Sequence, residues 1–208
     1  MLAIGGLTPF TTIDYPGKLA AVVFCQGCPW RCGYCHNRQL LDSGTAGVIE
    51  WKSVVALLEQ RRGLLDGVVF SGGEPTLQPG LPQALAEVRQ MGFLTGLHTA
   101  GPLPERLAAC LPLLDWVGMD LKAPFDCYDV ITGVPGSGKA AERSAELVRQ
   151  SGLPHQFRTT VDPFLQAAGR LKNLQQLVVG WGERLVLQEL QTVTAPAAHP
   201  SAALVSCA

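Results

Sequence analysis

The sequence predicts an α/β fold in which parallel strands form a partial (β/α)6 barrel that is open on one side. Apolar, β-branched segments alternate about six times with segments of helical periodicity, as in a parallel sheet with right-handed crossovers. A complete eight-unit barrel usually needs about 250 residues, whereas this chain has 208. Polar motifs also recur where the predicted strands end. These three observations together favour the open barrel.

Three strand–helix units occupy the first half of the chain. In order, we expect a strand at 19–24, a helix at 51–62, a strand at 67–70, a helix at 81–91, a strand at 94–98 and a helix at 103–114. The strands are short apolar runs, and Val54, Val55 and Leu58 share one face of the first helix. Gly92 is a typical stop signal for the second helix.

The second half continues the alternation. We expect a strand at 116–121, a helix at 139–150, a strand at 155–161, a helix at 165–179 and a strand at 184–190. Ser151 and Gly152 end the helix at 139–150. Leu171, Leu174 and Val178 recur at helical spacing in the helix at 165–179. Residues 1–190 are therefore predicted to form a single domain, and residues 191–208 an Ala/Pro-rich, loosely attached tail.

Composition argues against several classes of protein. The formal net charge is −1 and there is no long basic run, so we expect no nucleic-acid partner and no binding to a membrane surface. We find neither a secretory signal nor about 18 uninterrupted apolar residues that could span a membrane. The seven cysteines, an odd number with four close together, fit metal binding in a reducing cytoplasm better than a disulfide framework.

Five polar motifs lie at or just after the ends of predicted strands. They are CQGCPWRCGYC, SGGEP, HTAG, DLK and RTT. In parallel α/β sheets and barrels the carboxyl ends of the strands are where ligands bind. Because all five motifs fall on this one rim, we expect them to form a common site.

The first motif indicates an iron–sulfur cluster. Cys28, Cys32 and Cys35 form C-x3-C-x2-C, and Cys25 precedes them. Three thiolates on one short loop can hold three corners of a 4Fe–4S cube and leave the fourth iron open to a substrate. A zinc ion bound by four cysteines is the alternative, but structural zinc sites normally separate their two pairs by about 12 or more residues. A closed electron-transfer cluster would leave SGGEP without a role.

These motifs resemble the radical S-adenosylmethionine (radical SAM) superfamily. The cysteine triplet with Tyr34 before its last member, followed by Gly72, Gly73 and Glu74 after the next strand, carries the resemblance. More narrowly, the chain resembles the activating proteins of anaerobic ribonucleoside-triphosphate reductase, from about residue 4 to 188. The stretches that do so are IDYPGKLAAVVFCQGCPWRCGYCHN, VVFSGGEPTLQ, LHTAG, GMDLKAP, FRTTV and VLQ.

The resemblance implies roles for particular residues. Cys28, Cys32 and Cys35 would ligate the cluster, and the amino and carboxylate groups of SAM would chelate the fourth iron. The backbone and carboxylate of residues 71–74 would hold the methionyl ammonium. The remaining expected pocket residues are Tyr34, Thr99, Asp120, Lys122 and Arg158. Transfer of one electron into SAM would then yield a 5′-deoxyadenosyl radical that abstracts hydrogen.

Several of these residues also have structural interpretations. Asp120 and Lys122 could be the solvated side of a strand end, and Arg158 could pair with a surface carboxylate. His98 is expected to be a satisfied core histidine, and His36 with Asn37 to cap the next helix. Cys110, Cys127 and Cys207 are expected to have no role in the chemistry. The segment GVPGSGKA nearly matches a phosphate-binding loop, but Ala140 stands where the magnesium-binding hydroxyl belongs.

The resemblance implies an oxidoreductase that installs a glycyl radical on a partner, anaerobic ribonucleotide reductase, with electrons from a flavodoxin- or ferredoxin-like protein. Three alternatives stay open: activation of another glycyl-radical enzyme of the pyruvate formate-lyase kind, a small-molecule enzyme of the deazaguanine-forming kind, and a non-catalytic iron–sulfur electron carrier.

Overall fold

A curved, seven-stranded sheet organises the molecule. The computed structural model describes residues 2–190, so the predicted tail at 191–208, with Cys207, lies outside the described residues. The strands follow one another in sequence order across the sheet, β2 to β7 are parallel, and β1 pairs antiparallel with β2. The strands are β1 (Ile4–Thr11), β2 (Ala20–Cys25), β3 (Gly67–Gly72), β4 (Leu94–Thr99), β5 (Trp116–Asp120), β6 (His155–Val161) and β7 (Leu185–Glu189).

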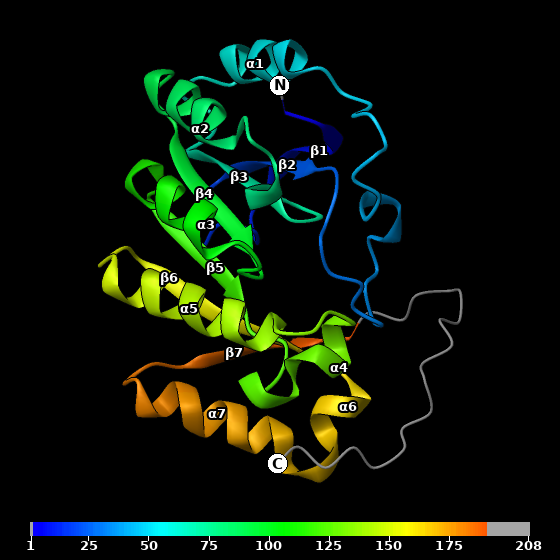
Figure 1. Cartoon of the computed structure of the whole chain (residues 1–208). Helices are drawn as coiled ribbons and strands as arrows, with labels where there is room; N and C mark the ends of the chain where they lie inside the picture. Colours follow the sequence, from blue (N-terminus) through cyan, green and yellow to red (C-terminus); the bar gives the residue numbers. More distant parts are fainter. Residues whose placement is uncertain (1, 191–208) are drawn as a thin grey trace.

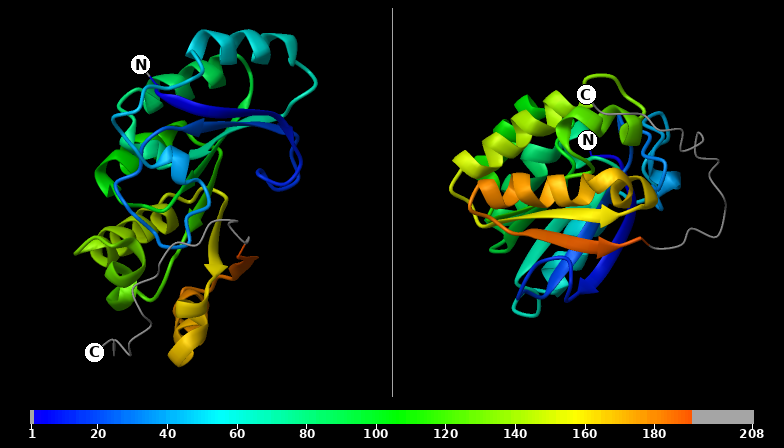
Figure 2. Two further views of the ribbon diagram at one scale, coloured as in Figure 1. Left: turned by 90° about the vertical axis from the view of Figure 1, so that its right-hand side faces the viewer. Right: turned by 90° about the horizontal axis from the view of Figure 1, so that it is seen from below.

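Helices connect the parallel strands and cover the outer face of the sheet (Figure 1, Figure 2). The α-helices are α1 (Trp51–Gln60), α2 (Leu81–Gln90), α3 (Pro104–Cys110), α4 (Tyr128–Thr132), α5 (Ser137–Gln150), α6 (Pro163–Gln166) and α7 (Arg170–Gly180). Short 3-10 turns occupy Arg38–Leu40, Pro75–Leu77, Leu111–Leu113, Phe125–Cys127 and Ala167–Gly169. The open, partial α/β barrel predicted from the sequence is confirmed.

The main core lies between the sheet and these helices. Alternate residues of each strand point to opposite faces, so Val23, Phe70 and Leu97 meet the apolar sides of the helices. Leu85 of α2 and Val148 of α5 belong to the same fully buried cluster. With the outer face committed to packing, the inner face is left for a ligand.

A second apolar cluster closes the lower part of the inner face. The chain between β1 and β2 turns inward there, and Tyr15 stacks on Trp116 with their ring centroids 5.4 Å apart. Gly96 makes room for this layer, because a Cβ at that position would lie 3.3 Å from the Tyr15 ring. Tyr15 and Trp116 therefore fill the inner face below any site at the carboxyl ends of the parallel strands.

Three elements differ from the sequence prediction. β1 was not predicted, since Gly5, Gly6 and Pro9 are poor strand formers; the strand forms at the sheet edge, where proline is tolerated. The segment CYDVIT, for which no helix was predicted, contains the helix α4. The predicted helix at 165–179 is broken near Ala168, whose φ is 52°, into α6 and α7.

Among the described residues, no helix is long and apolar enough to cross a membrane.

Candidate active site

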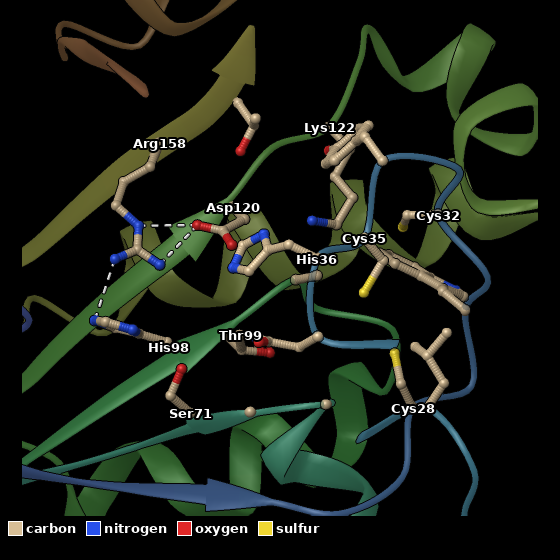
Figure 3. Close-up of a pocket in the computed structure, with 18 of the residues that line it drawn as sticks. Cys28, Cys32, Cys35, His36, Ser71, His98, Thr99, Asp120, Lys122 and Arg158 are labelled. Atoms are coloured by element: carbon tan, nitrogen blue, oxygen red, sulfur yellow. Dashed lines mark hydrogen bonds and ion pairs between the residues drawn. The ribbon is translucent and has the colours of Figure 1, made fainter. Parts of the chain in front are cut away.

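All five rim motifs meet at one cavity. It has a volume of about 270 Å3 and lies at the carboxyl ends of the parallel strands (Figure 3). The cysteine loop forms one wall, and the ends of β3 to β7 form the others. The predicted site residues that line it are Cys28, Cys32, Tyr34, Cys35, Gly72, Gly73, Thr99, Asp120, Lys122 and Arg158. The structure thus brings together every predicted site residue except Glu74.

The three cysteines of the motif are free thiols that line the cavity, while Cys25 is buried in the main core. Burial raises the pKa of Cys28 to about 12 and also raises that of Cys32. Bound iron would therefore have to supply the positive charge that deprotonates these thiols. No three His, Cys, Asp or Glu side chains of the described residues converge on a single-ion site. Three thiols of one loop around the same cavity suit a cube, which presents a separate iron atom to each ligand.

Glycine is required at the end of β3 because this strand end packs against backbone. A Cβ on Gly72, whose φ is +113°, would lie 2.5 Å from the Cys25 nitrogen, and one on Gly73 would collide with the Gly27 carbonyl. The close approach allows two backbone hydrogen bonds. Gly73 N donates to Cys25 O at 2.9 Å, and Glu74 N donates to Gly27 O at 2.8 Å. The motif is thereby joined directly to the cysteine loop.

Glu74 is buried just behind the cavity wall, with 1% of its surface exposed. Its Oε1 accepts hydrogen bonds from Thr76 N, Thr76 Oγ1 and Thr99 Oγ1 at 3.1, 2.6 and 2.7 Å. Its Oε2 accepts from Ala100 N at 3.0 Å. Burial raises the pKa of this carboxyl, and the four donors oppose that shift. All four donors come from the protein itself.

Lys122 is a cation without a hydrogen-bonded acceptor among the described residues. Its Nζ lies 5.6 Å from the centroid of the Tyr34 ring and points into the cavity between the cysteines and Asp120 (Figure 3). Burial lowers the pKa of Lys122, but Tyr34, Cys32 and Asp120 outweigh it and raise the pKa well above its ordinary value. The Tyr34 hydroxyl is buried and has no hydrogen-bond partner in residues 2–190. Both groups suit a ligand with an anionic or acceptor group.

Arg158, Asp120 and His98 form a charged wall opposite the cysteines (Figure 3). Arg158 Nε and NH2 contact Asp120 Oδ1 at 2.8 and 2.7 Å, and its NH1 lies 3.1 Å from His98 Nε2. Gly118 leaves space for this arrangement, because a Cβ there would lie 3.1 Å from Arg158 Cζ. Burial raises the pKa of Asp120, but the nearby charges of Arg158 and Lys122 outweigh burial and lower this pKa below its ordinary value. The carboxylate therefore stays ionised.

His98 was expected in the core, yet it lines the cavity. Burial and the neighbouring Arg158 lower its pKa to about 4, so its imidazole is neutral. His36 and Asn37, expected to cap a helix, also line the cavity, and Asn37 makes no side-chain cap. Thr160 and Gln188 also line the cavity but were not predicted to do so. Their positions in RTT and at the end of VLQ could have indicated this.

The segment that resembles a phosphate-binding loop is filled by the protein itself. The Asp129 carboxylate accepts hydrogen bonds from Gly136 N, Ser137 N and Ser137 Oγ at the start of α5. A phosphate would have to displace this anion from the helix N-terminus. The arrangement supports the interpretation of this segment as a structural loop.

Comparison with known proteins agrees with the geometry. The radical SAM superfamily matches residues 22–188. A Methanocaldococcus jannaschii protein, provisionally named a glycyl-radical enzyme activating enzyme, is 30% identical over 77% of this chain and 68% of its own. The pyruvate formate-lyase-activating enzyme of Clostridium pasteurianum is 35% identical over 58% of this chain and 53% of its own.

Solved structures share the fold at low sequence identity. Streptococcus suis SuiB bound to S-adenosylmethionine superposes with a TM-score of 0.63 and 16% identity, over 83% of this chain and 40% of SuiB. The protein anSMEcpe with bound AdoMet gives a TM-score of 0.63 and 20% identity, over 80% of this chain and 49% of its own. With the family match spanning most of the described strands, the chain belongs to the radical SAM superfamily, whose enzymes use S-adenosylmethionine and a 4Fe–4S cluster held by three cysteines.

Proposed function

We propose that this radical SAM enzyme is a glycyl-radical-enzyme activase whose partner is anaerobic ribonucleoside-triphosphate reductase. The observation that carries the proposal is the single cavity that contains the three thiols of C-x3-C-x2-C and the strand-end residues expected to hold SAM. The likeness to the M. jannaschii protein, over 77% of this chain, supports the activase branch.

Each wall of the cavity has a part in the proposed reaction. Cys28, Cys32 and Cys35 would hold the cluster at three of its irons. When bound, the cluster and SAM would supply reductive cleavage of the sulfonium, with one electron from the external reductant, and hence a 5′-deoxyadenosyl radical for hydrogen abstraction. Lys122, which has no hydrogen-bonded acceptor within residues 2–190, would bind the SAM carboxylate, because a buried ammonium is stabilised by an ionic hydrogen bond.

The remaining pocket residues would orient SAM. The backbone at Gly72 and Gly73 can approach the methionyl group closely because neither residue carries a Cβ. Tyr34 and Thr99 would line the pocket on the cysteine and β4 sides. Asp120, held by Arg158, offers an ionised acceptor of fixed orientation.

The open side of the barrel suits a polypeptide substrate. β1 and β7 are the two edges of the sheet, so the gap lies between them. Apolar side chains are exposed at both edges: Phe10 of β1 and Ile13 just after it, 51% and 85% exposed, beside the amino end of β2, and Leu187 of β7, 47% exposed. An extended loop of the reductase could dock there and bring its glycine to the cavity.

Reconstitution of the complete reaction tests this proposal. The anaerobic protein, with its cluster, would be mixed with SAM, the reductase and either dithionite or a flavodoxin- or ferredoxin-like reductant. We expect 5′-deoxyadenosine to accumulate and a stable organic radical to appear by electron paramagnetic resonance (EPR). Its doublet should collapse when the partner's glycine is deuterated at Cα.

A small-molecule substrate is the second candidate. A 7-carboxy-7-deazaguanine synthase of Thermococcus kodakarensis is 29% identical over 51% of this chain. If SAM cleavage responds only to a pterin-like molecule, and neither the reductase nor a pyruvate formate-lyase relative acquires a radical, this candidate replaces the activase. If the reduced protein never cleaves SAM, the electron-carrier alternative stands instead.

A further inference from the structure

We propose that Glu74 is a positioning residue that ties three walls of the cavity together through its buried carboxylate and its backbone amide, and that its carboxylate does not bind the ammonium of SAM. The inference deepens the proposed function and rests on its use of this cavity for SAM. It departs from the expectation that the Glu74 carboxylate is itself a ligand for the methionyl group.

Four donors hold the carboxylate before any ligand arrives, three of them at Oε1 and one at Oε2. Two donors of Thr76, the Thr99 hydroxyl and the Ala100 amide surround its two oxygens at 2.6 to 3.1 Å. The side chain is 1% exposed and is not part of the cavity lining, unlike Gly72 and Gly73. An ammonium group in the cavity could therefore reach the carboxylate only if the wall in front of it opened.

Its hydrogen bonds connect separate pieces of backbone. Thr76 belongs to the same loop as Glu74, whereas Thr99 and Ala100 stand at the end of β4. On its other side, the Glu74 amide donates to the carbonyl of Gly27 in the cysteine loop at 2.8 Å. One residue therefore fixes the relative position of the cysteine loop, the end of β3 and the end of β4.

Thr99 passes this constraint on along its own loop. Its hydroxyl donates to Glu74 and accepts a hydrogen bond from Gly101 N at 3.0 Å. Loss of the carboxylate would release both the Ala100 amide and the Thr99 hydroxyl. The β4 end of the cavity would then move relative to the cysteines, and SAM would bind less well even though no direct contact was lost.

Glu74→Gln is the informative variant because an amide has only one oxygen. The backbone amides of Thr76 and Ala100 donate to opposite carboxylate oxygens. In either orientation of the glutamine, one of them faces an NH2 group and loses its acceptor. Relief of this buried, unsatisfied donor should displace the end of β4, and we expect SAM binding to weaken on the order of tenfold as a result.

Two SAM ligands separate positioning from direct contact. Dissociation constants would be measured for SAM and for an analogue without the amino group, on wild-type and Glu74→Gln protein with its cluster. A positioning residue weakens both ligands by the same factor. If the variant weakens SAM but leaves the analogue unchanged, the carboxylate binds the ammonium and the proposal is wrong.

Amide hydrogen exchange provides a readout that needs no cluster. In the protein without iron, Glu74→Gln should speed exchange at Ala100. Thr99→Val should do the same, because it removes the hydrogen bond between the end of β4 and Glu74. Thr76→Val is the matched control: it removes a bond to the same oxygen, but within one loop, and should leave Ala100 unchanged. Thr99→Ser, which keeps the hydroxyl, should exchange at Ala100 as slowly as the wild-type protein does.

Unaltered exchange at Ala100 in both Glu74→Gln and Thr99→Val would overturn the proposal. Thr99→Val keeps the test available if Glu74→Gln does not fold. A wild-type protein that binds neither ligand, while its Ala100 exchange follows the predicted pattern, would instead count against the proposed function.

Discussion

Replacing Gly72 by alanine would place a methyl group against the backbone from which the cysteine loop begins. The new Cβ would lie 2.5 Å from Cys25 N and 2.6 Å from Cys25 O, too close for backbone atoms to yield cheaply. The φ of +113° is also one that L-residues rarely adopt. The conformation should cost about 1–3 kcal/mol, and the overpacking about 1–3 kcal/mol more. Together they predict a loss of about 2–6 kcal/mol in the free energy of unfolding.

Two other glycines separate these contributions. Gly92 has a φ of +90° but open space around its Cβ position, so Gly92→Ala should show only the conformational cost. Gly73 lacks a positive φ but is crowded by the Gly27 carbonyl, so Gly73→Ala should show mainly the steric cost. Urea unfolding of the protein without iron, followed by circular dichroism under anaerobic conditions, measures all three. If Gly72→Ala were no more destabilising than Gly92→Ala, the steric argument would be refuted.

Three further changes test other parts of the structure. Cys25→Ala should retain the iron content of reconstituted protein whereas Cys28→Ala should not; loss of iron in the first alone would reverse the assignment of ligands. His98, with a folded pKa of about 4 against an ordinary value of 6.5, binds fewer protons folded than unfolded. The free energy of unfolding of the wild-type protein should therefore fall by about 2 kcal/mol more than that of His98→Asn between pH 8 and pH 5. An equal fall in the two proteins, measured by urea unfolding at each pH, would contradict this. Asp129→Ala removes the cap of α5 and should lower the free energy of unfolding by about 0.5–2 kcal/mol, without creating affinity for ATP by equilibrium dialysis.

The parallel part of the fold could be predicted because its signals are local. Short apolar strands, helical periodicity and polar strand ends follow from the sequence segment by segment, and each of the six predicted strands corresponds to one of β2 to β7. β1 could not be recognised because its backbone is stabilised by pairing with β2, while Gly5, Gly6 and Pro9 give it no propensity of its own. The turn of Ala168 into the left-handed region is likewise a tertiary effect.

The site divides in the same way. Motif order placed Cys28, Lys122 and Arg158 on one rim, and the structure shows them around one cavity. The direction in which a side chain points within a motif depends on three-dimensional neighbours. Glu74 follows two cavity-lining glycines in sequence, yet donors from β4 draw its carboxylate behind the wall. In the sequence His98 looked like a core residue, because its partner Arg158 is 60 residues away and their contact could not be foreseen.

The Tyr15–Trp116 stack fills the barrel beneath Phe24 and His98, which line the cavity. Because Gly96 and Gly118 lack side chains, the two aromatic rings can fill the space over this part of the sheet. Tyr15 is carried by the segment that joins β1 to β2, so an edge strand outside the parallel repeat supplies half of this base. Relatives built on the same six parallel strands could therefore differ in substrate length through this one connection, with the catalytic rim unchanged.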